Sequence, residues 1–210
     1  MSSLRMRHEN RSGETGRGGQ ESPKAEAEKG KEMMDRYLSA EELLEIPEAL
    51  MPMPVLSDNL QSPVSAGIKA HTHGCYGHFM WLIAPGAFAS MQTNGYKMVK
   101  VEDFIGSDRL KLWYFPGWTE ADRAKVRKAI DKELNRPWWK NRYDFFSYLG
   151  HLTGLRWIQS PWSDVCSDKG KFIGLVEKDF NLRAPNPEEV NHWLESIKPR
   201  AQIYGRYTPD

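Results

Sequence analysis

The chain has 210 residues, of which 40% are hydrophobic and 11% aromatic, enough to bury one sizeable core, so disorder along its whole length is excluded. Its 29 Lys and Arg against 28 Asp and Glu leave a formal charge of +1, so no global field indicates nucleic acid or anionic lipid as a partner. The only cysteines, Cys75 and Cys166, are too few for a multi-bridge secreted scaffold, which favours a thiol role over a disulfide.

Residues 1–35 are predicted to form an N-terminal arm that is disordered or ordered only by a partner. Up to Lys31 the arm contains no Phe, Trp, Tyr, Ile or Val, so it cannot bury enough apolar surface to offset the entropy of ordering. We also find no signal-peptide pattern and no stretch of 18 uncharged apolar residues. We therefore expect no membrane span, a cytoplasmic or virion-associated location, and contacts with protein partners through the arm.

A short helix and a proline-rich connector are predicted for residues 36–66, ahead of a folded domain at 67–210. Ser39 and Glu42 make a capping box that opens the helix, and Pro47 closes it. Further prolines among the next residues favour an irregular connector.

An antiparallel meander is predicted to follow the connector. The residues Phe79–Ile83 form a continuous apolar run, as in a buried strand. Asn94-Gly95 is a strong hairpin signal. The predicted strands are 68–84, 87–92, 96–101 and 110–115, with a closing strand at 202–207.

Helices are predicted mainly after the strands. Thr119 and Asp122 cap a helix over 120–135, and Asn186 caps another that starts at Pro187. Further helices are predicted over 145–152 and from Ser163. Because strands and helices are segregated, the fold class is α+β, with an antiparallel sheet packed against helices.

One cysteine and one histidine are the first candidates for chemistry. With Ser163 as N-cap, Cys166 would be the third residue of a helix, where the helix N-terminus favours the thiolate. His78 opens the most apolar strand and could accept the thiol proton. The alternative is that Cys166 is a small packed hydrophobe and His78 a structural residue.

A series of short motifs spans the folded part of the chain, in the order Gly77–Ile83, Phe88–Ser90 followed by Asn94-Gly95, Val101–Phe104, Tyr143-Asp144, Val165–Asp168 and Asn186–Val190. Together they resemble the circularly permuted branch of the NlpC-type papain-like cysteine hydrolases, which includes YiiX-like proteins and relatives of lecithin:retinol acyltransferase. The similarity covers about Ala70 to Thr208. It implies a permuted papain-like fold in which Cys166 is the nucleophile and His78 the base, both facing a common cleft.

The resemblance also implies a third polar residue that orients the histidine from the neighbouring strand. By register this is Ser90, twelve residues after His78, where the family usually has a histidine or an acidic residue. Gln92 lies on the same strand face and could hold the imidazole through its side-chain carbonyl instead. A neutral partner stabilises an imidazolium less than a carboxylate does.

A segment rich in histidine and cysteine precedes His78. If it is extended, His71, His73 and Cys75 project from one face and, with His78, offer four zinc-type ligands. Four ligands from one continuous strand are geometrically awkward, and the chain has no Cys-x-x-Cys to supply a second pair. We interpret the segment as a polar strand end at the mouth of the cleft and predict no metal or cofactor, although the metal alternative stays open.

Two functions follow from these observations. The first is a cysteine-dependent hydrolase or acyltransferase acting on an amide or ester bond, with Trp157, Trp162 and Tyr143 as candidate walls of the substrate cleft. The second is a non-catalytic structural or assembly protein, such as a phage virion component, that uses the papain-like fold as an interaction module. A neutral residue, Ser90 or Gln92, in place of a histidine or an acidic residue is what we expect in a protein of this fold that has lost its catalytic activity.

Overall fold

The computed structural model describes residues 38–59, 61–137, 141–143, 163–164, 166–182, 185–197 and 201–204. The predicted arm at 1–35, the predicted helix over 145–152, Trp157 and Trp162 lie outside these residues. Within the described ranges, no helix combines the length and the apolar character needed to cross a membrane.

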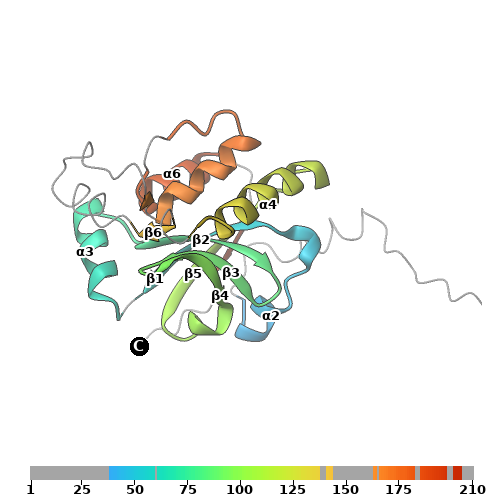
Figure 1. Ribbon diagram of the computed structural model, residues 1–210. Helices are drawn as coiled ribbons and strands as arrows, with labels where there is room; N and C mark the ends of the chain where they lie inside the picture. Colours follow the sequence, from blue (N-terminus) through green and yellow to red (C-terminus); the bar gives the residue numbers. More distant parts are fainter. Residues whose placement is uncertain are drawn as a thin grey trace, which may run out of the picture.

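A six-stranded sheet forms the centre of the described part, with the strand order β4-β3-β2-β1-β5-β8 (Figure 1). Each neighbouring pair in it is antiparallel. Its strands are β1 (Met53–Asn59), β2 (His78–Ala84), β3 (Ala87–Gln92), β4 (Gly95–Lys100), β5 (Asp108–Tyr114) and β8 (Ala201–Tyr204). A separate two-stranded parallel sheet contains β6 (Arg142–Tyr143) and β7 (Ser163–Asp164).

Helices cover both faces of the large sheet: α4 and α6 lie above it in Figure 1 and α2 lies below. The helices are α2 (Ala40–Leu44), α3 (Pro63–Thr72), α4 (Glu120–Leu134) and α6 (Pro187–Ser196), with 3-10 helices η1 (Glu48–Leu50), η2 (Val101–Asp103) and η4 (Cys166–Leu175). The N-caps predicted for α2, α4 and α6 are present, and each belongs to a complete capping box. The expected α+β class, with an antiparallel sheet packed against helices, is confirmed.

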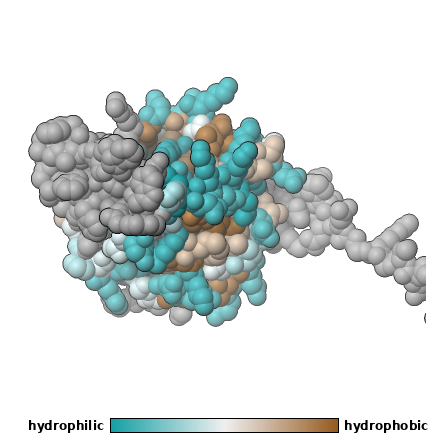
Figure 2. All heavy atoms as spheres, in the orientation of Figure 1, coloured by the Kyte–Doolittle hydropathy of each residue, from teal (hydrophilic) through white to brown (hydrophobic). Residues whose placement is uncertain are grey.

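Two hydrophobic layers lie on the two faces of the sheet, because side chains alternate along each strand. Phe79 and Trp81 of β2 pack in one layer with residues of α4, η4 and α6, and we call this side the α4 face. Met80 and Leu82 pack in the other layer with residues of α2, on the side we call the α2 face. Hydrophilic residues predominate on the described surface seen in Figure 2, with hydrophobic ones between them.

The connector predicted within 36–66 was wrong at Met53–Asn59, which forms β1 in the middle of the sheet. Pro54 pairs with Trp81 of β2, while the ladder with β5 begins one residue later, at Val55. The N–H that Pro54 lacks is therefore not needed on the β5 side, and this makes a proline compatible with a central strand.

The strand predicted over 68–84 begins only at His78. Pro63–Thr72 instead forms α3, because Ser62 caps the helix and Pro63 occupies its first turn. His73 ends α3 in the left-handed conformation, with φ 51°. The extended row of His71, His73 and Cys75 that a zinc site would require was therefore a wrong expectation.

Candidate functional site

His78, half-buried at the start of β2, is the centre of a hydrogen-bonded group on the α2 face. Its Nε2 lies 2.7 Å from Ser90 Oγ, and Gln92 Nε2 donates to the same Oγ at 2.8 Å. Burial lowers the pKa of His78 to about 4, so at neutral pH the imidazole is uncharged and Nε2 can accept the Ser90 hydroxyl proton. Ser90 is thus the residue that holds the imidazole. The expectation that a Gln92 carbonyl holds it was wrong, since the Gln92 amide bonds to Ser90.

Cys166 is the first residue of η4 and is 4% exposed. Ser163 was wrongly predicted as its N-cap: it lies in β7, paired with Arg142 of β6. Burial raises the pKa of Cys166 to about 11, and the nearby Asp168 raises it further. The backbone N–H groups of Phe79, Ser167 and Cys166 act in the opposite direction and lower it. The thiol is therefore protonated at neutral pH, yet it already sits among hydrogen-bond donors suited to a negative charge.

The Cys166 thiol and the His78 ring approach the start of β2 from different sides of the strand. Cys166 packs on the α4 face with Phe79, whereas Ser90 pairs with Met80, a residue of the α2 face. Because His78 is two residues before Met80 and bonds to Ser90, its ring lies on the α2 face. No hydrogen bond joins Cys166 to His78 among the described residues. The described residues place the sulfur near the Phe79 backbone and the imidazole at Ser90, so they do not bring the two groups to one face of the sheet.

Two further polar residues, which the sequence did not single out, extend the group around His78. Ser57 of β1 lies directly across from His78, and its side chain is buried. Asp108 of β5 is also buried, and burial raises its pKa although the Ser107 and Ser57 hydroxyls act against that rise. Asp108, Ser57, His78 and Ser90 thus form a polar row across four strands, which only the strand register could reveal.

A buried ion pair fixes the helix that carries Cys166. Lys169 of η4 is 1% exposed, and its Nζ lies 2.6 Å from Glu133 Oε2 of α4. The Lys169 carbonyl accepts a hydrogen bond of 3.1 Å from Trp81 Nε1 of β2. Lys169 therefore ties η4 to both α4 and the sheet, and holds the Cys166 sulfur at Phe79.

The remaining candidates are not gathered around His78 by the described residues. Of Tyr143 only the backbone is described, in β6, and Trp157 and Trp162 lie outside the described residues. His73 and Cys75 are exposed, and the described part of the chain holds no group of three or more His, Cys, Asp or Glu side chains that could bind a metal ion.

The chain matches no protein-family model and no curated protein sequence. The family resemblance therefore rests on the quoted motifs alone.

Proposed function

We propose that this protein is a cysteine-dependent hydrolase or acyltransferase that acts on an amide or ester bond, on a permuted papain-like fold. The observation that carries the proposal is the position of the Cys166 sulfur: backbone N–H groups, one of them from Phe79, the residue after His78, act to lower the pKa of its thiol. Such donors favour both a thiolate and the oxyanion of an acyl-transfer intermediate. The neutral imidazole of His78, fixed by Ser90, is in the protonation state that a general base requires.

The proposed reaction begins from a neutral pair, because the pKa values of about 11 for Cys166 and about 4 for His78 leave no thiolate–imidazolium at rest. In this reaction the His78 ring leaves Ser90 and turns round the start of β2 to the α4 face, where Nε2 takes the proton of the thiol. The thiolate then attacks the substrate carbonyl, and the leaving amine or alcohol takes the proton from His78 as a thioester forms. Water completes hydrolysis, or a second acceptor completes acyl transfer, and Cys166 regains its proton.

A non-catalytic structural or assembly role is the second candidate. The observation that favours it is the protonated, buried thiol of Cys166, which lacks a hydrogen bond to His78 in the described structure. In that case Cys166 is a packed core residue, and His78 with Ser90 satisfies the polar end of a strand.

The two candidates differ in the reactivity of Cys166 toward an acyl donor. The experiment treats the full chain, in a Cys75→Ala background, with an activated ester and locates the thioester by mass spectrometry. We expect acylation of Cys166, its loss in Cys166→Ala, and a rate lower by about a hundredfold or more in His78→Asn, the usual contribution of a general base. Acylation of Cys166 only after denaturation would exclude the hydrolase and leave the structural role.

A further inference from the structure

The loop of residues 73–77 joins α3 to β2 and ends at His78, so its placement fixes where the histidine begins its strand. Two of its glycines have no room for a side chain. A Cβ at Gly74 would overlap the Glu188 side chain of α6, and one at Gly77 would overlap Ser65 Oγ of α3. The loop backbone is thus enclosed between two helices, and close approach rather than an unusual backbone angle explains both glycines.

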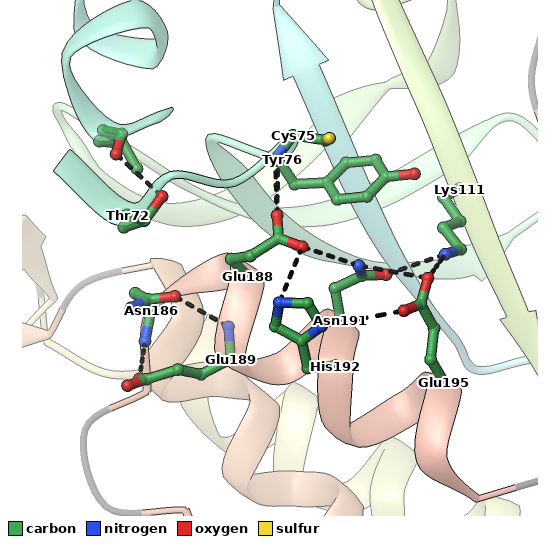
Figure 3. Close-up of polar contacts among 11 residues, drawn as sticks. Thr72, Cys75, Tyr76, Lys111, Asn186, Glu188, Glu189, Asn191, His192 and Glu195 are labelled. Carbon is green, nitrogen blue, oxygen red and sulfur yellow. Dashed lines mark hydrogen bonds and ion pairs between the residues drawn. The ribbon is translucent and has the colours of Figure 1, made fainter. Parts of the chain in front are cut away.

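One carboxylate, that of Glu188, holds this loop (Figure 3). Glu188 Oε2 accepts hydrogen bonds from the backbone N–H of Cys75 at 2.7 Å and of Tyr76 at 3.3 Å. Its other oxygen, Oε1, accepts from Asn191 Nδ2 at 3.0 Å and lies 3.6 Å from His192 Nε2. Both oxygens of a largely buried carboxylate are therefore engaged, and one of them bonds only to loop backbone.

A buried lysine of the sheet completes the arrangement. Lys111 of β5 is 2% exposed, and its Nζ donates to Asn191 Oδ1 at 3.0 Å and to Glu195 Oε1 at 2.6 Å. Because Asn191 gives its oxygen to Lys111, its amide nitrogen is turned toward Glu188. A continuous chain of hydrogen bonds thus leads from β5 through α6 to the loop, as Figure 3 shows.

We propose that Glu188 is a positioning residue for His78: by binding the Cys75 and Tyr76 N–H groups, it sets the loop that delivers the imidazole to Ser90. The role assigned to His78 rests on the proposed function, whereas the loop contacts do not. Directly after the two clamped residues, the Gly77 N–H donates to Ser57 O at 3.1 Å, so the loop passes straight into the paired strands. Glu188 acts through the loop and bonds to its backbone rather than to the His78 ring.

The test compares Glu188→Gln with Glu195→Gln in the full chain. Both remove one carboxylate from the Lys111 network, but only Glu188 bonds the loop. In Glu188→Gln the amide donors face either the two loop N–H groups, where two hydrogen bonds are lost, or the Asn191 amide, where one is lost. In both orientations the loop also loses the charge that strengthens its hydrogen bonds. We expect amide exchange at Cys75 and Tyr76 to be about tenfold faster or more in Glu188→Gln and unchanged in Glu195→Gln.

The NMR titration of the His78 ring separates positioning from general loosening. A released loop admits water to the ring, so the pKa of His78 should rise from about 4 toward 6.5 in Glu188→Gln but not in Glu195→Gln. Acylation of Cys166 should slow about tenfold in Glu188→Gln. Gly74→Ala, which crowds the carboxylate without removing its charge, is the second variant and should act the same way.

The outcomes distinguish the two proposals. If exchange and the His78 titration respond while wild-type Cys166 resists acylation, the positioning role stands and the hydrolase fails. Unchanged exchange and titration in both Glu188→Gln and Gly74→Ala, or an equal response in Glu195→Gln, would overturn the positioning role.

Discussion

Two buried lysines, Lys169 and Lys111, have closely similar surroundings and different consequences. Each lies within 2.6 Å of a glutamate oxygen and near an aromatic ring, Tyr96 at 5.1 Å from Lys169 Nζ and Trp113 at 4.6 Å from Lys111 Nζ. The partner of Lys169 is Glu133 of α4, to which Arg136, two residues after the end of that helix, also bonds. The Lys111 network continues through Asn191 to Glu188 and ends on backbone N–H groups of a loop.

The difference shows what a buried charge can be used for in this fold. The Lys169–Glu133 ion pair joins two side chains, one from η4 and one from α4, and stabilises the packing of these two elements. The Lys111 network ends on the backbone just before His78, so it transmits the position of the sheet to a candidate site residue. The Lys111 ammonium also acts on Glu195. Burial raises the pKa of Glu195, but the hydrogen bond and charge of Lys111 lower it by more, so the pKa lies below its ordinary value.

Breaking the Lys169 pair should have the largest effect on stability. Lys169→Met leaves the half-buried Glu133 carboxylate without its main partner, and the free energy of unfolding should fall by about 3 kcal/mol. Chemical denaturation measures this change. Lys171→Met, on the same helix but at an exposed position, is the control and should stay within about 0.5 kcal/mol of wild type. A loss below about 1 kcal/mol in Lys169→Met would mean that Arg136 alone satisfies Glu133.

Removing the other lysine should cost less stability but disturb the loop. In Lys111→Met the Glu195 side chain, 41% exposed, can turn to water, so we expect a loss of about 2 kcal/mol. Amide exchange at Cys75 and Tyr76 should rise in Lys111→Met and stay unchanged in Lys169→Met. Equal exchange in the two variants would erase the distinction between the two lysines.

Acid should weaken the protein through His78. The folded pKa of about 4 lies below the ordinary 6.5, so between these values the unfolded chain binds a proton that the folded chain does not. Stability therefore falls as the pH drops from neutral toward 4, by about 1 kcal/mol or less at pH 5 for this partly solvated ring. Denaturation curves at several pH values should show a shallower fall in His78→Asn, and an identical fall would assign the acid sensitivity to other groups.

The smallest effect is expected at Cys75, because Glu188 binds its backbone N–H and not its thiol. Cys75→Ala should change the free energy of unfolding by less than about 0.5 kcal/mol and leave Tyr76 exchange unchanged. Cys75→Pro removes the N–H itself and should release the loop. If the alanine variant releases the loop as strongly as the proline variant, the thiol takes part in the clamp.

Sequence patterns predicted the features that depend on only a few neighbouring residues, namely helix caps and turns. The capping boxes of α2, α4 and α6 are contained within four residues each, and β3 was predicted with its observed bounds because Asn94-Gly95 and Pro85-Gly86 punctuate it. The α3 start was also readable, since Ser62 and Pro63 are a cap and a first-turn proline. The strand prediction for this segment was wrong because apolar residues lie on both sides of Gly74 and Gly77, so the sequence pattern does not separate α3 from β2.

Long-range pairing explains what the sequence did not reveal. Prolines suggested a connector at β1, and only the end of the β5 ladder at Val55 shows why Pro54 is tolerated there. In the site, Ser90 was found from a fixed spacing to His78, but Ser57 and Asp108 needed the register of two other pairings. The lysine networks join residues 36 and 80 positions apart, which composition and periodicity do not relate.

The strand order also has a consequence for the order of assembly. Strands β2, β3 and β4 are successive hairpins, whereas Val55 of β1 must meet Leu112 of β5, and Lys111 must meet Tyr204 of β8. Closing such long loops costs more chain entropy and slows folding, so we expect the hairpins to form first and β5 and β8 to join later. The His78–Ser90 contact belongs to the early strands. Asp108, which belongs to the polar row, and Lys111, which bonds to Asn191 of α6, take their places only when β5 docks. The polar row and the hydrogen bonds that hold the loop are therefore completed in the last stage of folding.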